Sequence, residues 1–300
     1  MANLRDVQLR MRAVRQTLQV TKAMNLISTA KLRKGRRLLE DTEPFFNRIQ
    51  KSMYDILSGA GAMQSDFFGS LGGIRGEGPK EGSPAVVAVT SDKGLAGGYN
   101  ANVCRQVNTL CASLEKPVLI VIGSIGTRYF AHSPYPVLES LSFKSKLPDL
   151  EDAKEFTDYL IAQYLWGMFS EVHIVYTHMY STVKVQPTVR QALPLKLEKL
   201  QQEIAETGGQ KRANLQFEYL PSEKAVFDAL VPFYLKGLVY GALVEAYVSE
   251  QSARMAAMDE ASKNAEEMLG SLQIHYNRVR QAGITQEVTE IISGSAALLD

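Results

Sequence analysis

The 300-residue chain has only two cysteines, Cys104 and Cys111, which lie seven positions apart. In a helix this separation places the two Cα atoms about 10 Å apart. That distance is too long for a disulfide without backbone movement. We therefore expect two thiols on one buried helix face, in a reducing compartment of cytoplasmic type.

Long apolar runs are also missing: by inspection, none reaches the roughly 18 residues that a bilayer-spanning helix needs. The net charge of +1 gives no global signal for nucleic acid or membrane. The N-terminal segment is rich in arginine and poor in acid, as in an organelle transit peptide. Its apolar positions are regularly spaced, however, and we interpret it as a structural helix.

The motifs of common catalytic sites are absent. There is no G-x-x-x-x-G-K-[ST] loop, no G-x-S-x-G elbow, and no H-x-x-x-H or H-E-x-x-H pairing among the four histidines. The stretch SDKGLAGGYN (91–100) lacks the G-x-G-x-x-G spacing of a dinucleotide loop. It favours a tight turn before a closely packed helix. We expect no catalytic residue, no metal site and no cofactor, with a nucleotide-binding α/β protein carrying coiled-coil arms as the alternative.

What the sequence does contain is a heptad pattern at each end. Steps of three and four residues are typical of a coiled-coil seam. In the N-terminal segment they connect Leu4, Val7, Met11, Val14 and Leu18. In the C-terminal segment they connect Met258, Ala265, Met268, Leu272 and Val279, with Ala261, His275 and Ala282 between or after them.

The two ends carry opposite charge. Residues 1–40 hold ten Lys and Arg against two acidic residues, whereas residues 241–300 hold four basic and nine acidic residues. The C-terminal pattern begins after Ser222, a good N-cap, and continues for some seventy residues to Gly294, which suits a helix stop. Such a helix spans about 105 Å, more than one compact domain can bury. We expect the two ends to pair as an antiparallel coiled coil.

Between the ends, the sequence predicts an inserted α/β domain. Short β-branched or alternating runs predict strands at 85–90, 117–123, 171–180, 182–195 and 215–220, and amphipathic runs predict helices at 99–114 and 152–169. The alternation favours a small, largely parallel, Rossmann-like sheet. The expected division is an N-terminal helix (1–57, with Pro44 kinking or interrupting it), a Gly/Ser-rich linker (58–83), the α/β domain (84–220) and a C-terminal helix (221–300).

Three stretches resemble the γ subunit of F-type ATP synthases. They are AVRQTLQVTKAMNLISTAKLRKG (13–35), TSDKGLAGGYNANV (90–103) and the long C-terminal run 249–298. The resemblance extends nearly end to end and implies a central rotor shaft, non-catalytic by itself, that couples rotation of a c-subunit ring driven by protons or sodium ions to changes in a catalytic hexamer. It implies α, β and ε subunits and the c ring as partners, and no nucleic acid.

The resemblance also implies roles for particular residues. The residues that would contact a β-subunit loop are Arg280, Gln281 and Thr285. A basic girdle facing an acidic β segment comprises Lys31, Arg33, Lys34, Arg36 and Arg37. The neck holds Lys22 and Met24, and the apical bearing holds Ile291, Ile292, Ala296 and Leu298. The foot toward the c ring and ε subunit holds Phe217, Tyr219 and Glu223.

The sequence departs from the plant-plastid pattern, because residues 195–215 contain no cysteine pair. Thiol regulation of that kind is therefore not expected. The chain starts at its first helix, which favours a bacterial protein on the cytoplasmic face of the cell membrane, held there peripherally through the c ring. A nucleic-acid-binding coiled coil that uses the basic helix remains a further alternative, although no aromatic platform accompanies its arginines.

Overall fold

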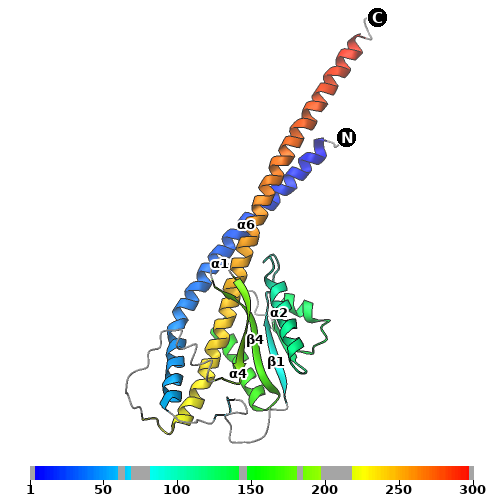
Figure 1. Ribbon diagram of the computed structural model, residues 1–300. Coiled ribbons are helices and arrows are strands. Elements are labelled where there is room, and N and C mark those ends of the chain that lie inside the picture. Colours follow the sequence, from blue (N-terminus) through cyan, green and yellow to red (C-terminus); the bar gives the residue numbers. More distant parts are fainter. Residues whose placement is uncertain are drawn as a thin grey trace. The chain divides into compact units, whose positions relative to one another are not determined.

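The computed structural model describes residues 4–59, 65–68, 82–141, 147–180, 185–196 and 218–296. The chain divides into two compact units, one made of Met1–Thr29 and Arg254–Asp300 and the other of Ala30–Ala253. Two long helices, α1 (Leu4–Gly59) and α6 (Glu223–Ala296), each contribute residues to both units (Figure 1).

The first unit is an antiparallel pair formed by the start of α1 and the later part of α6. Gln8 Nε2 donates to Tyr276 Oη at 3.1 Å, and Asn25 Nδ2 donates to the Met255 carbonyl at 3.1 Å. A residue further along α1 (Asn25 instead of Gln8) thus contacts a residue earlier in α6 (Met255 instead of Tyr276). The two helices are therefore antiparallel. Figure 1 shows these segments in blue and orange.

The seam of this pair differs in part from the expected one. Met258 and Ala265 are buried, and Leu272 and Val279 are half-buried. Met268, however, is 45% exposed, so its placement in the seam was wrong. The intervening half-buried positions are Leu269 and Tyr276 instead. On the facing helix, Val7 is buried and Leu4, Met11, Val14 and Leu18 are half-buried.

The second unit contains a five-stranded sheet with strand order β3-β2-β1-β4-β5. The first four strands in this order are parallel, and β5 is antiparallel to β4. The strands are β1 (Ser83–Val89), β2 (Val118–Ile122), β3 (Val137–Leu141), β4 (Phe169–Met179) and β5 (Val185–Leu193). The helices that accompany them are α2 (Tyr99–Ser113), α3 (Ser124–Phe130) and α4 (Leu150–Leu165).

Two elements of this unit were not expected from the sequence, namely α3 and β3. Four of the five β3 residues are exposed, so the strand lacks the apolar signal of β1 and β2. The expected strand at 215–220 was wrong for residues 218–220, which are not in a strand, and residues 215–217 lie outside the described residues.

The core of the sheet domain lies where β1 and β2 meet α2. All five residues of β2 are buried, and Cys104 and Cys111 pack against this core from α2. Burial raises the pKa of each thiol to about 11. Both cysteines are free, which confirms two thiols on one buried helix face.

Three positions of the long helices, Ser222, Pro44 and Gly294, were expected from the sequence to start, kink or end a helix. Ser222 Oγ accepts a hydrogen bond from the Ala225 amide at 3.2 Å and so caps α6, as expected. Pro44 does not interrupt α1, contrary to expectation. Glu40, whose carbonyl loses its partner at Pro44, is exposed to water. At the other end, α6 continues through Gly294 to Ala296, so the expected glycine stop was wrong.

One described helix, α6, satisfies the length and composition of a membrane span over one window, of which 56% is buried inside the protein. Those buried side chains belong to the core of the second unit, for example Phe227, Val231 and Leu235. A core helix satisfies the same criteria, so the observation is weak evidence for a membrane span.

Candidate functional site

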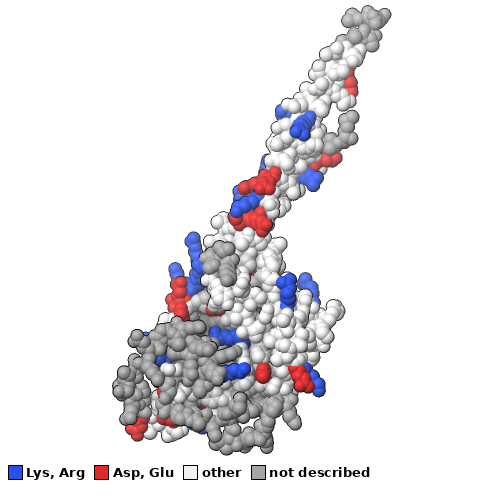
Figure 2. Space-filling model, viewed as in Figure 1, with Lys and Arg blue, Asp and Glu red and all other residues white. Residues whose placement is uncertain are grey.

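The last part of α6 is the most solvated segment of secondary structure in the first unit. Every residue from Arg280 to Ser293 is exposed. Among the described residues, the cross-helix hydrogen bond nearest this end is the one from Gln8 to Tyr276. The helix continues for 20 residues beyond Tyr276, to Ala296, which covers about 30 Å. Figure 2 shows a few separate acidic and basic groups on this end of the helix pair. A helix end of this length cannot be stabilised by burial within the described chain.

Arg280, Gln281 and Thr285 all lie on this exposed segment. Thr285 Oγ1 donates to the Gln281 carbonyl at 2.9 Å, so its hydroxyl is used within the helix. Nothing in the described ranges gives the Arg280 guanidinium or the Gln281 amide a hydrogen bond or ion pair. These two groups are therefore available to an external partner, and the exposed Thr285 hydroxyl oxygen can still accept a hydrogen bond.

An apolar stripe runs along the same segment. Ile284, Val288, Ile291 and Ile292 are 53%, 49%, 70% and 62% exposed, and their spacing of four, three and one residues puts them on one helix face. Ala296 is the last helical residue, and Leu298 lies outside the described residues. The segment thus offers separate polar and apolar contacts.

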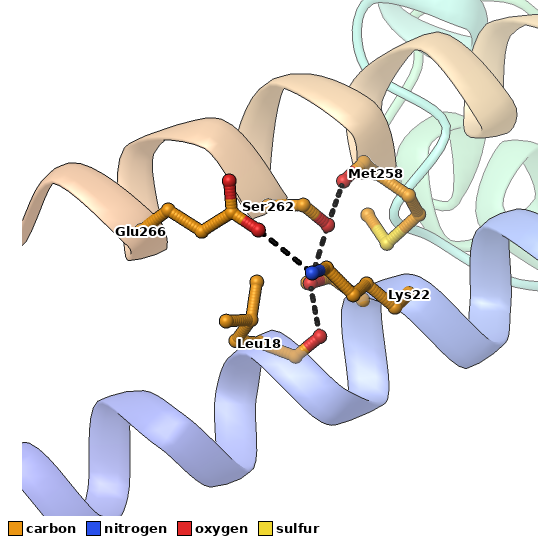
Figure 3. A network of polar contacts seen from close by, with 6 residues as sticks. Leu18, Lys22, Met258, Ser262 and Glu266 are labelled. Atoms are coloured by element: carbon orange, nitrogen blue, oxygen red, sulfur yellow. Dashed lines mark hydrogen bonds and ion pairs between the residues drawn. The ribbon is translucent and has the colours of Figure 1, made fainter. Parts of the chain in front are cut away.

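The neck contains a polar contact between α1 and α6 that the sequence did not reveal (Figure 3). Ser262 Oγ lies 2.8 Å from Thr21 Oγ1 and 2.8 Å from the Met258 carbonyl, and Thr21 Oγ1 donates to the Leu18 carbonyl at 3.0 Å. Thr21 and Ser262 are 7% and 8% exposed. Because both hydroxyls are satisfied, this buried polar layer is tolerated, and it favours one alignment of the two helices.

Beside this layer, Lys22 Nζ lies 2.7 Å from Glu266 Oε1. Both side chains are more than half exposed, so the ion pair contributes only about 0–1 kcal/mol. Met24, the other expected neck residue, is half-buried. Figure 2 shows acidic and basic groups interleaved along this helix pair.

The basic girdle lies on the α1 segment of the second unit. Arg33, Lys34 and Arg37 are exposed, and Lys31 and Arg36 are half-buried. Arg36 Nη2 approaches Met179 Sδ at 3.3 Å, at the end of β4. Arg36 is therefore engaged with the sheet domain, whereas Arg33, Lys34 and Arg37 face solvent.

The foot residues lie where the chain enters α6. Tyr219 is half-buried; burial, with the charges of Asp55 and Glu223, raises the pKa of its hydroxyl. Glu223 is exposed in the first turn of α6. Phe217 lies outside the described residues.

The 91–100 loop is a turn tied down by its own side chains. Asn100 Oδ1 accepts from the Ser91 amide at 2.9 Å, and Asp92 Oδ1 accepts from the Ser124 amide at 2.9 Å. Leu95 has a φ of 64°, in the left-handed region. These bonds favour the tight-turn interpretation over a phosphate-binding loop.

The sheet reverses its strand order between β1 and β4, and the crevice at such a point is where doubly wound folds bind ligands. Here α6 bonds to residues flanking that crevice. Tyr99 Oη donates to the Ala246 carbonyl at 3.2 Å, and Ser249 Oγ donates to the Thr177 carbonyl at 2.9 Å. This packing argues against the nucleotide-binding alternative.

Two histidines of β4, His173 and His178, each lie beside a carboxylate. His173 Nε2 lies 2.6 Å from Glu171 Oε2, and His178 Nδ1 lies 2.7 Å from Glu245 Oε2. No group of three or more His, Cys, Asp or Glu side chains in the described ranges could hold a metal ion. The described part of the chain thus offers contact surfaces for partner proteins.

The chain is similar to known proteins over nearly its whole length. A family model described as ATP synthase matches residues 3–298. An ATP synthase gamma chain of Acetivibrio thermocellus is 37% identical over 299 residues, covering 99% of this chain and 100% of the relative. One from Ruminiclostridium cellulolyticum is 39% identical over 298 residues, covering 99% of each.

Among solved structures, a chain of the Euglena gracilis mitochondrial ATP synthase has a TM-score of 0.66 at 19% identity, covering 98% of this chain and 94% of that one. At this identity the likeness shows the fold alone. The assignment of the chain to a family rests on the family model and the two bacterial relatives. The chain belongs to the ATP synthase family, among its gamma chains.

Proposed function

We propose that this chain is the central rotor shaft of an F-type ATP synthase, and that the exposed end of α6 transmits torque to the catalytic hexamer. The chain performs no bond chemistry itself. The observation that carries the proposal is the run of exposed residues from Arg280 to Ser293 on a helix that is otherwise paired or buried. Such a segment requires an external partner.

Arg280 and Gln281 hold a β-subunit loop at one rotary angle. Their side chains have directional donors and are exposed on adjacent positions of α6. A hydrogen bond to a charged group contributes about 1.5–3 kcal/mol, enough to favour one angle over others. Thr285 donates its hydroxyl proton to the Gln281 carbonyl, and its exposed oxygen accepts a hydrogen bond from the loop.

The apolar residues beyond this pair form a bearing. Ile291 and Ile292 are strongly exposed and present no hydrogen-bonding side-chain group. Dispersion contacts with an apolar collar have little directional preference. This part of the helix can therefore turn while the polar pair engages and releases.

Weak charge attraction guides the shaft at its girdle. Arg33, Lys34 and Arg37 are exposed cations that face an acidic segment of the β subunits. Exposed ion pairs contribute about 0–1 kcal/mol each, so they exchange readily as the shaft rotates.

The foot connects the shaft to the membrane part of the complex. Tyr219 and Glu223, at the entry to α6, face the c ring and the ε subunit. Through these contacts the chain is a peripheral member of the membrane-associated complex, at the cytoplasmic face of a bacterial membrane.

The test replaces Arg280 and Gln281 together by alanine in the assembled complex. We expect helix content and melting temperature to change little, because exposed helix substitutions usually alter stability by less than about 0.5 kcal/mol. Steady-state ATP hydrolysis should fall severalfold to about tenfold, since about 1.4 kcal/mol of contact energy corresponds to a factor of ten.

The matched control is Asn277→Ala with Arg278→Ala, which removes the same two group types from exposed positions one turn earlier. This control should keep its hydrolysis rate. Wild-type hydrolysis and ion pumping by a fully assembled Arg280→Ala, Gln281→Ala complex would leave the stretch as a solvated helix face.

A further inference from the structure

The seam of the helix pair in the first unit becomes polar over one stretch of α1. Its buried and half-buried positions run as apolar residues from Leu4 to Leu18 and then continue as Thr21, Asn25 and Ser28. On α6, buried and half-buried positions follow steps of three and four residues at Met255, Met258, Ser262, Ala265, Leu269, Leu272, Tyr276 and Val279. Polar residues therefore occupy positions where a coiled coil normally carries apolar side chains.

The apolar layers alone leave the alignment of the two helices open. Counting heptads from the Thr21–Ser262 contact places Leu18 opposite Ala265. A slip of one heptad would place Leu18 opposite Leu272, which is again an apolar layer. Such a slip moves α1 along α6 by about 10 Å. Burial of apolar surface therefore distinguishes poorly between the two alignments.

The Thr21–Ser262 layer does distinguish between them (Figure 3). Thr21 Oγ1 donates to the Leu18 carbonyl at 3.0 Å, so the 2.8 Å contact between the two hydroxyls uses the Ser262 proton. After a slip of one heptad, Thr21 would lie opposite Leu269, which has no group that could bond to it. The buried hydrogen bond across the seam exists in one alignment only.

The other polar contacts of the neck depend less on the alignment. Asn25 Nδ2 donates to the Met255 carbonyl at 3.1 Å, and backbone carbonyls recur on every turn of a helix. Lys22 and Glu266 are both more than half exposed, so their ion pair is weak. The buried hydroxyl pair is therefore the neck contact that is most sensitive to register.

We propose that Thr21 and Ser262 are positioning residues that hold α1 and α6 in a single register. A buried polar residue at a seam position specifies register at some cost in stability. The register fixes how far α6 extends beyond the start of α1, and hence where Arg280 and Gln281 lie along the helix pair. The consequence for torque rests on the rotor role proposed above, whereas the register itself does not.

The test measures the distance between the two helices in the full-length chain by pulsed electron paramagnetic resonance. Spin labels are attached to Arg10→Cys on α1 and Glu287→Cys on α6, both at exposed positions. Cys104 and Cys111 are buried and should stay unlabelled in the native chain. Glu287 lies about 20 Å further along α6 than the residue opposite Arg10, so a slip changes the label distance by up to about 10 Å.

The decisive variant is Thr21→Val with Ser262→Ala. The chain with both hydroxyls should give one label distance, and this variant should add a second population displaced by up to about 10 Å. Its thermal midpoint should be unchanged or higher, because both partners of a buried hydrogen bond are replaced by apolar groups. The exchange Thr21→Ser with Ser262→Thr keeps both hydroxyls and should restore the single distance.

The matched control is Thr17→Val with Ser271→Ala, which makes the same substitutions at exposed hydroxyls of the same two helices. Thr17 Oγ1 donates to the Ala13 carbonyl at 3.1 Å and Ser271 Oγ to the Met268 carbonyl at 2.9 Å, each within its own helix. This control should keep the single distance.

A single distance in the Thr21→Val, Ser262→Ala chain would overturn the proposal, and so would an equal second population in the control. Failure of the double variant to fold would also overturn it, because the layer would then supply stability instead of alignment. In the assembled complex, the double variant should pump fewer ions per ATP hydrolysed, and the control should not. A slipped free chain with full coupling in the complex would support the register role and count against the torque path along α6.

Discussion

Two glycines of α6, Gly237 and Gly241, provide a matched test of how closely the long helices pack in the second unit. At Gly237 an added Cβ would stand inside the ring of Phe46 on α1. At Gly241, one turn further on, nothing lies within 4 Å of the added Cβ. The same substitution by alanine therefore has opposite consequences at the two sites.

The expected change in the free energy of unfolding combines two opposing effects, helix propensity and overpacking. Alanine in a helix interior is more favourable than glycine by about 0.5–1 kcal/mol. At Gly241 that gain remains, and Gly241→Ala should raise the free energy of unfolding by that amount. At Gly237 the Phe46 ring must move, and overpacking costs about 1–3 kcal/mol. Gly237→Ala should thus lower the free energy of unfolding by up to about 2 kcal/mol.

Urea denaturation of the isolated full-length chain, followed by circular dichroism at 222 nm (roughly the α-helix minimum), measures both variants against the wild type. Phe46→Ala added to Gly237→Ala should remove the clash, so the double variant should show a coupling energy of at least about 0.5 kcal/mol. Equal or greater stability of Gly237→Ala relative to Gly241→Ala would refute the close approach of α1 and α6 at this point.

Three other substitutions or measurements test separate features. Leu269→Asp should destabilise the isolated chain by about 2 kcal/mol or more, and Met268→Asp by less than about 1 kcal/mol, because only the former places an unpaired charge in the helix seam; equal melting temperatures would contradict the observed register. Cys104 and Cys111, with pKa values of about 11, should resist iodoacetamide at pH 8 in the native chain and react after unfolding in urea. Because these folded pKa values exceed the unfolded one, the thiol contribution to stability should be complete below about pH 8.5 and decline toward pH 11; a flat profile there would argue against their burial. A cysteine at Tyr219 should cross-link to a polar loop of the c subunit in the assembled complex, and identical labelling of that cysteine in free and assembled chains would count against the foot.

Several parts of the architecture follow from the sequence alone. The β-branched runs at 85–90 and 117–123 predict buried strands, and Ser222 predicts the start of α6. These signals are local: they depend on side-chain branching and on capping chemistry, which act within a few residues. The oppositely charged ends and their heptad spacing likewise predict the antiparallel pair.

Other features were decided by tertiary contacts. Met268 and Leu269 are adjacent and both apolar, so periodicity could place either in an alanine-rich seam; α1 covers Leu269 and leaves Met268 in water. β3 pairs by its backbone with β2 while its side chains stay mostly exposed, and hence no apolar alternation marked it. Backbone pairing leaves no pattern in the side-chain sequence.

The candidate site likewise has features that the sequence predicted and features that depend on tertiary contacts. Its polar and apolar residues along α6 were predicted from sequence and resemblance, because exposure of a solvated helix end depends on composition. The Thr21–Ser262 layer was not, since it brings together residues far apart in the chain and leaves no local motif. The sequence by itself determined the two long helices, α2, α4, the main strands and their charge. Which side chains meet across those elements was decided only by packing, because the contact energies depend on partners that the local sequence does not contain.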